Sequence, residues 1–115
     1  SSAFAVQEVY LTATSGSGID FNFDVNQAIV FTNTFPWIVK ASCQITCDNQ
    51  VKNRMQATVL KKSGSLNDMP MKAGDQLSLD IYNEDTFSMS AASGSKVEIK
   101  NIGEGPIKVT CSIVN

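Results

Sequence analysis

PWIVKASCQITC, residues 36–47, is the stretch that decides the predicted fold, because it is the longest uninterrupted β-like run in the chain. Its side chains alternate with a period of two, which is the repeat of a β-strand. The mainly apolar face consists of Trp37, Val39, Ala41, Cys43, Ile45 and Cys47. The opposite face consists of Ile38, Lys40, Ser42, Gln44 and Thr46. Such alternation is typical of an antiparallel strand with one buried side, so we expect the apolar face to lie in the core.

A second stretch near the C-terminus has the same plan. Residues 33–43, NTFPWIVKASC, and residues 101–111, NIGEGPIKVTC, both begin with Asn and reach Cys ten residues later. A β-like segment ends at the Asn of each copy, and turn-forming residues follow it. We interpret each copy as a β-hairpin. Chance similarity between hairpins rich in Ser, Thr and Asn explains the pattern equally well, so no duplication is required.

Other segments also alternate. Residues 19–25, IDFNFDV, and residues 77–82 alternate cleanly and predict strands. Residues 54–62 contain good helix formers, but their alternation and context favour a strand. Residues 4–14 predict an edge strand or a bulge, because the phase of the alternation slips near Glu8. Residues 63–74 predict a loop or an edge segment, because Pro70 cannot occupy a central ladder position.

The sequence therefore predicts an all-β fold in a single domain that spans residues 1–115. Eight or nine short strands, with Gly, Pro, Asn and Ser between them, are typical of an antiparallel two-sheet β-sandwich of the jelly-roll or Ig-like kind. A chain of 115 residues buries about two-thirds of its unfolded surface, which is enough for a core.

The composition excludes some partners. The net charge is −2 and no Lys/Arg-rich run is present, so nucleic acid is not an expected partner. No apolar run approaches the length of a membrane span, so no transmembrane segment is expected. Charged residues make up 17% of the chain, and this polar, lightly charged texture favours a soluble secreted or cell-surface protein.

The three cysteines leave at least one thiol unpaired within the chain. Cys43 and Cys47 would lie about 14 Å apart on an extended strand, which is too far for a disulfide. Cys111 therefore pairs with one of them, or all three are free thiols in the core. Because the chain has no His, a structural zinc site is not expected.

No catalytic motif is present. Without His, neither a Ser-His-Asp nor a Cys-His arrangement can form, and the sequence has no phosphate-binding glycine motif and no CxxC pair. We expect a protein that is not an enzyme and that needs no cofactor.

Asp20, Asn22 and Asp24 form the first candidate site, on one face of the predicted strand 19–25. They have the spacing of the first ligands of a calcium loop, but Val25 and Phe31 stand where that loop needs Gly and Glu. We expect a solvated face and no metal. A contact with a sugar hydroxyl or a divalent ion, helped by a neighbouring loop, is the alternative.

Phe35, Pro36 and Trp37 form the second candidate site, an aromatic turn. We expect these side chains to plug one end of the sandwich, because aromatic side chains bury a large area. The alternative is an exposed platform that stacks on a sugar ring or anchors a protein. Met69 and Met71 present the same choice, and we expect them to fill a gap in the core.

The function predicted from these features is a non-catalytic binding module, lectin-like or adhesin-like, for a carbohydrate or cell-surface ligand. The predicted ligand-binding residues are Asp20, Asn22, Asp24, Phe35 and Trp37. The alternative is a self-assembling structural or toxin-like subunit. Separate acidic and basic blocks of sequence, which could attract each other between subunits, lead us to expect a homo-oligomer whose assembly is sensitive to salt.

Overall fold

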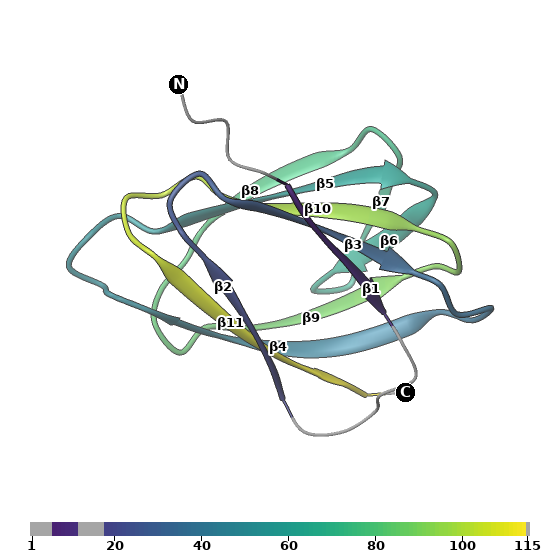
Figure 1. The fold of residues 1–115 in the computed structure, drawn as a ribbon, viewed down its shortest axis with the longest axis horizontal. Helices are drawn as coiled ribbons and strands as arrows, with labels where there is room; N and C mark the ends of the chain where they lie inside the picture. Colours follow the sequence, from purple (N-terminus) through teal and green to yellow (C-terminus); the bar gives the residue numbers. More distant parts are fainter. Residues whose placement is uncertain (1–5, 12–17, 115) are drawn as a thin grey trace.

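The computed structural model describes residues 6–11 and 18–114, and these residues form eleven β-strands in two sheets packed face to face (Figure 1). The first six strands are β1 (Gln7–Leu11), β2 (Ile19–Phe23), β3 (Ala28–Asn33), β4 (Val39–Cys47), β5 (Arg54–Lys61) and β6 (Ser63–Leu66). The last five are β7 (Met69–Lys72), β8 (Gln76–Asp80), β9 (Thr86–Ala91), β10 (Lys96–Asn101) and β11 (Ile107–Ile113). No helix in the described ranges is long and apolar enough to cross a membrane.

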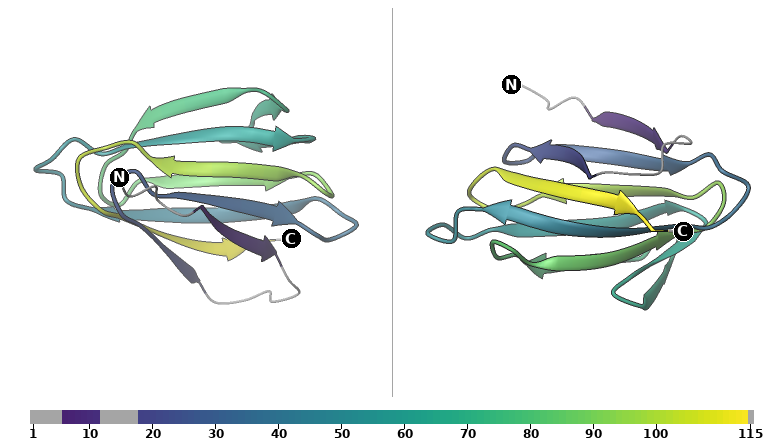
Figure 2. Two further views of the ribbon diagram at one scale, coloured as in Figure 1. Left: turned by 45° about the horizontal axis from the view of Figure 1, so that its top comes forward. Right: turned by 90° about the horizontal axis from the view of Figure 1, so that it is seen from below.

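The first sheet has the strand order β1-β3-β10-β5-β8, and the second has the order β2-β11-β4-β9-β6-β7. Figure 2 shows β1 and β2 on one side of the molecule and the β6–β7 pair on the other. The all-β two-sheet sandwich is thus confirmed. The number of strands exceeds the prediction because residues 63–72 form the paired strands β6 and β7, and β7 lies at the sheet edge that Pro70 requires. β1 is parallel to β3, unlike the predicted antiparallel arrangement.

The core lies between the two sheets. Its buried side chains are less than a tenth exposed and come from both sheets: Phe23, Ile29, Ile45, Met55, Ile81 and Ile107. In β4, the inward side chains of Val39, Cys43 and Ile45 are buried, as the alternation predicted. The central strand of the prediction is therefore correct over β4, although the pattern does not hold before Val39.

The two similar stretches are related by an approximate twofold axis. Val30 pairs with Glu98 between β3 and β10, and Cys43 pairs with Cys111 between β4 and β11. The two residues of each pair are 68 positions apart. A twofold axis that passes through both pairs therefore relates each residue of the first stretch to the residue 68 positions later. The flanking strands follow the same rule. Phe23 of β2 pairs with Ile107 of β11, and the residues 68 positions away from these two, Ala91 of β9 and Val39 of β4, also pair with each other. Units β2-β3-β4 and β9-β10-β11 therefore form an internal structural repeat.

The turns within the two units also correspond. Asn26, between β2 and β3, and Gly94, between β9 and β10, both have a positive φ, of 69° and 77°. The Asn26 amide donates to the Asn101 carbonyl at 2.9 Å, and the Gly94 amide donates to the Asn33 carbonyl at the same distance. The turns therefore follow the same offset of 68 residues as the strand pairings.

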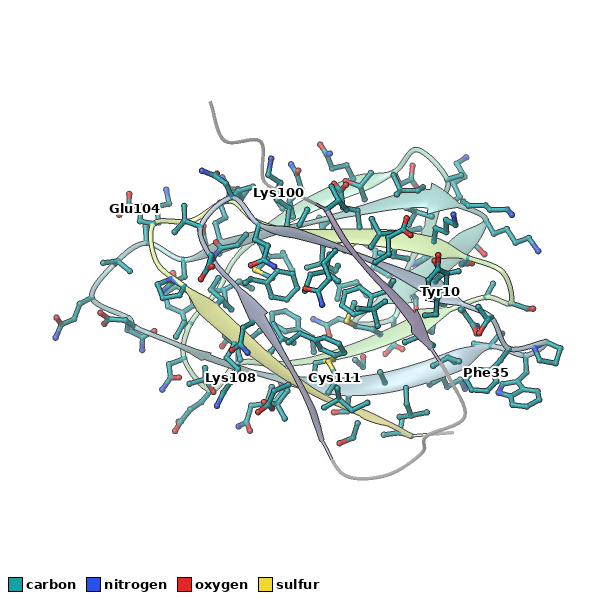
Figure 3. The ribbon with its side chains drawn as sticks, in the orientation of Figure 1. Tyr10, Phe35, Lys100, Glu104, Lys108 and Cys111 are labelled. Atoms are coloured by element: carbon teal, nitrogen blue, oxygen red, sulfur yellow. A yellow bond between two sulfur atoms is a disulfide. The ribbon has the colours of Figure 1, made fainter. Side chains whose placement is uncertain are left out.

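The connection within each copy is not a hairpin. β3 and β10 belong to the first sheet, whereas β4 and β11 belong to the second, so residues 34–38 and 102–106 cross from sheet to sheet. We call these connections the first arch and the second arch. They lie at opposite ends of the molecule, as the labelled Phe35 and Glu104 show in Figure 3. The hairpin interpretation was wrong because the same turn residues serve a connection within a sheet and one between sheets.

A disulfide joins Cys43 and Cys111 across the approximate twofold axis, and Cys47 is a free thiol. This settles the pairing that the sequence left open, and it agrees with the exclusion of a bridge between Cys43 and Cys47. The bridge links the central strands β4 and β11 of the two units. It therefore fixes the two repeats against each other within the second sheet.

Candidate functional site

A buried asparagine holds the first arch. The Asn33 side chain is 1% exposed, and its Nδ2 donates to the carbonyl oxygens of Trp37 and Ala91, both at 2.9 Å. Nδ2 also lies 3.2 Å from the Ala92 carbonyl oxygen, and Oδ1 accepts from the Phe35 amide at 2.9 Å. Because both ends of the carboxamide are bonded, the arch has one fixed path between the sheets.

Asn101 holds the second arch in the same way. Its side chain is fully buried, and Nδ2 donates to the carbonyl oxygens of Gly105 at 2.9 Å and Phe23 at 3.1 Å. Its Oδ1 accepts from the Gly103 amide at 2.9 Å. Each of these partners lies 68 positions from the corresponding partner of Asn33. The sequence carried this signal, since both copies begin with Asn, but we interpreted it only as a turn residue.

The two arches differ in what covers them. The β4–β5 connection lies against the second arch, where the Glu104 amide donates to the Lys52 carbonyl at 2.8 Å. A Cβ atom added to Gly103 would lie 2.6 Å from the Arg54 backbone nitrogen, so this close approach requires glycine. The counterpart of Glu104 in the first arch is Pro36, which has no amide proton to satisfy. The first arch therefore carries bulky side chains that the shared backbone framework does not need.

Those bulky side chains form an apolar surface, exposed except for the partly buried Phe35, which we call the aromatic arch: Phe35, Pro36, Trp37 and Ile38. The Phe35 and Trp37 rings are stacked, with centroids 5.0 Å apart and an interplanar angle of 17°. Trp37 is 55% exposed and Ile38 is 50% exposed. The Ser93 hydroxyl donates to the Phe35 carbonyl at 2.6 Å and ties the arch to the β9–β10 turn.

The prediction that Trp37 lies in the core was wrong. β4 begins at Val39, and Trp37 precedes it in the arch, so the continuing alternation has no structural meaning there. The Trp37 ring stacks against Phe35, outside the space between the sheets. Phe35 is partly buried, so the expected plug at this end is present only in part.

The acidic candidate site lies elsewhere. Asp20, Asn22 and Asp24 are all exposed, as predicted for a solvated face, and Asp24 follows the end of β2. The Thr110 hydroxyl donates to Asp20 Oδ1 at 2.7 Å. The described residues contain no group of His, Cys, Asp and Glu that could hold a metal ion.

The structure does not bring the two candidate sites together. Asp20 aligns across β11 with Gln44, and Gln44 lies five residues along β4 from Val39, where the first arch ends. Five strand residues span about 17 Å. The predicted ligand-binding residues therefore divide into an aromatic group at one end of the sandwich and a polar group along β2.

The space between the sheets contains a feature that the sequence did not indicate. A cavity of about 160 Å³ is lined almost entirely by apolar side chains of both sheets. At the β1–β2 side its lining includes Leu11, Ile19 and Phe21, and Ile19 is 42% exposed. The sequence predicted which faces of the strands are apolar. It did not predict the cavity, because the volume left between the two sheets depends on where the edge strands lie.

Cys47 is the free thiol among the described residues, and its environment does not activate it. Burial raises the pKa of the Cys47 thiol, and the carboxylates of Asp85 and Asp48 raise it further. A nucleophilic cysteine needs the opposite shift, because the thiolate is the reactive form. Nothing in the geometry around this thiol therefore points to covalent chemistry.

No protein-family model matches the chain, and no curated protein matches it significantly. Among solved structures, it is similar to Aeromonas hydrophila PliG, described as a periplasmic lysozyme inhibitor of g-type lysozyme. The sequence identity is 11% and the TM-score is 0.37, over 97% of this chain and 100% of that chain. At that TM-score the likeness carries no argument about this protein.

The matched structure is described as an enzyme inhibitor and not as a lectin or an adhesin, so it does not agree with the predicted lectin-like or adhesin-like function. Recognition of carbohydrate is not supported. A homo-oligomer is not supported either, and one contact joins the basic and acidic blocks within the chain itself. Arg54 of the basic block pairs with Asp80 of the acidic block in the β5–β8 ladder, with Nε and Oδ1 at 3.4 Å.

Proposed function

We propose that this protein is a non-enzymatic module that binds a protein partner through the aromatic arch. The observation that supports this proposal is the contrast between the two arches. They share one hydrogen-bonding framework, yet only the first carries Phe, Pro and Trp where the second carries Gly, Glu and Gly. Because the second arch keeps the framework without aromatic side chains, the hydrogen bonds of the arch do not require the aromatic side chains of the first.

The aromatic arch has the properties of an interface anchor. Trp is over-represented among the residues that contribute most to protein–protein binding. Asn33 and Ser93 bond to the backbone of the arch, and the Phe35 and Trp37 rings stack on each other, which supports an arrangement formed without a partner. Such preorganisation reduces the entropy lost on binding, which leaves more of the contact energy as affinity.

The partner is first captured from an extract of the source organism on the immobilised chain, then identified and purified for titration calorimetry. Trp37→Ala should weaken binding by about 2 kcal/mol or more, a factor of about 30, as expected for a central anchor. The same variant should change the free energy of unfolding by less than about 1 kcal/mol, because the ring is largely exposed. Equal affinity of wild type and Trp37→Ala would refute the proposal.

Two controls separate binding from folding. Tyr82→Ala removes an aromatic side chain that is 59% exposed and that follows β8 near the β4–β5 connection, so it should leave binding unchanged. A triple variant, Phe35→Gly, Pro36→Glu and Trp37→Gly, gives the first arch the residues of the second. This variant should remain folded, because the second arch shows that the framework accepts those residues, and it should lose the partner.

A further inference from the structure

The edge of β2 breaks the approximate twofold symmetry. On its outer side β9 is paired with β6, whereas no described strand pairs with the outer side of its counterpart β2. Figure 2 shows the same difference, with the β6–β7 pair present only at the β9 side. The pairing of β6 with β9 therefore serves as a template for a strand that would pair with the outer edge of β2.

The backbone groups that face this edge follow from the repeat. In β9, the Ser88 carbonyl and the Ala92 amide point toward β6, since they bond to Asn67 and Ser63 at 2.8 and 3.0 Å. The residues of the first unit that correspond to Ser88 and Ala92, 68 positions earlier, are Asp20 and Asp24. Their backbone groups therefore point toward the outer edge of β2, and those of Asn22 do too, because alternate residues of a strand face the same edge. The Asp24 amide is bonded to the Gln27 side chain at 3.0 Å, so the outward backbone groups of Asp20 and Asn22 are the ones that no described strand pairs.

The side chains that such a strand needs on its inner face also follow. Leu66 of β6 pairs with Met89 and is buried in the core. The counterpart of Met89 is Phe21, which lines the cavity together with Leu11 and Ile19. An apolar side chain opposite Phe21 would therefore enter the interior, as Leu66 does on the other side of the molecule.

The outer face of the strand needs the opposite charge. Ser65 pairs with Ser90, whose counterpart is Asn22, so the outward side chain opposite Asn22 would lie between the carboxylates of Asp20 and Asp24. Lys108 pairs with Asn22 from the β11 side, but it makes no ion pair with either carboxylate among the described residues. A Lys or Arg side chain at that position would complement the two acidic residues.

We propose that the outer edge of β2 accepts an extended segment of a partner protein, antiparallel to β2, in which apolar residues alternate with Lys or Arg. This mode of recognition adds a strand to a sheet, with main-chain hydrogen bonds for affinity and alternate side chains for specificity. The surface is separate from the aromatic arch, so the inference goes beyond the proposed function. A second copy bound through its own β2 is disfavoured, because the acidic faces of two β2 strands would repel each other.

The probe is a fluorescent peptide of alternating Lys and Val, of about eight residues, which is an ordinary strand length. Its binding is measured by fluorescence anisotropy, and hydrogen exchange reports the Asn22 amide. We expect the Asn22 amide to exchange fast in the free protein and to become protected when the peptide binds. An Asn22 amide that is already protected in the free protein would overturn the proposal, because the edge would then be occupied.

Asn22→Pro removes the amide proton from the free edge and leaves the β11 ladder bonds, because proline is tolerated on edge strands. Circular dichroism and the intact disulfide confirm its fold. This variant should lose the peptide, and a peptide with N-methylated backbone should fail to bind the wild type. Equal binding of the N-methylated peptide would instead show entry of apolar side chains into the cavity alone and would overturn strand addition.

Charge reversal tests the alternation. The double variant Asp20→Lys and Asp24→Lys should prefer a Glu-Val peptide over the Lys-Val peptide, with a combined change of about tenfold at low salt. An unchanged preference, or no binding of the Lys-Val peptide to the wild type, would overturn the proposal. Trp37→Ala should bind the peptide normally, so failure of this inference and failure of the proposed function are distinguishable.

Discussion

The buried asparagines provide the sharpest test of the arch framework. Asn33→Ala removes the donations to the Trp37 and Ala91 carbonyl oxygens and the acceptance from the Phe35 amide. Each hydrogen bond contributes about 1 kcal/mol net, and buried groups left without partners add to the loss. We therefore expect the free energy of unfolding to fall by about 3 kcal/mol. Asn101→Ala removes the three corresponding bonds and should cost about the same.

The assay is urea unfolding of both variants with the disulfide intact. For a chain of this size the slope is about 2 kcal/mol per molar urea, so a loss of 3 kcal/mol lowers the midpoint by about 1.5 M. A loss below about 1 kcal/mol for either variant would refute the reasoning, because it would mean that water replaces the carboxamide without penalty.

The same pair of variants also separates stability from binding. Asn33→Ala releases the aromatic arch and should weaken the partner interaction, because the rings are no longer held in one arrangement. Asn101→Ala lowers stability equally but acts at the other end of the molecule, so binding should persist under conditions in which it is folded. If both variants lost the partner to the same extent, the effect would come from stability, and preorganisation of the aromatic arch would be rejected.

Three further predictions concern the framework. Denatured, unreduced protein should contain one titratable thiol per chain. At pH 7.5, native Cys47 should react with iodoacetamide more slowly than an unperturbed thiol, because burial raises its pKa, and the rate should rise with pH as the thiolate forms. Gly94→Asn should change the free energy of unfolding by less than about 1 kcal/mol, whereas Gly94→Val should cost about 1–2 kcal/mol, since the counterpart Asn26 already adopts a positive φ. Removal of the disulfide by a double Cys→Ser change should cost about 4 kcal/mol in urea unfolding, given the sequence separation of 68 residues, and a cost near zero would contradict the constraint on the unfolded chain.

Alternation predicted the strands because each strand buries only one face. β2, β4, β5 and β8 were found where the period of two occurred, and the inward residues of β4 are buried as expected. The geometry of an extended strand also excluded the bridge between Cys43 and Cys47. These features depend on local spacing, which a sequence displays directly.

The features that failed depend on distant segments. Asn33 and Pro36 are compatible with a hairpin or with an arch, and the choice depends on whether the next strand joins the same sheet. The exposure of Trp37 depends on what covers the arch, and the β4–β5 connection covers the other arch instead. The aromatic turn was identified as a candidate from its residue types, but its exposure could not be derived from them.

Both candidate surfaces arise from the same asymmetry. The segment that connects the two repeats, residues 48–85, covers the second unit twice: its first part packs against the second arch, and β6 pairs with the edge of β9. One connecting segment cannot also cover the equivalent places of the first unit, so the first arch and the edge of β2 are left without those covers among the described residues. The first arch carries aromatic side chains, and the edge of β2 carries carboxylates with an apolar cavity behind it. The internal repeat thus provides the same framework twice, and its single connecting segment covers that framework only in the second unit among the described residues.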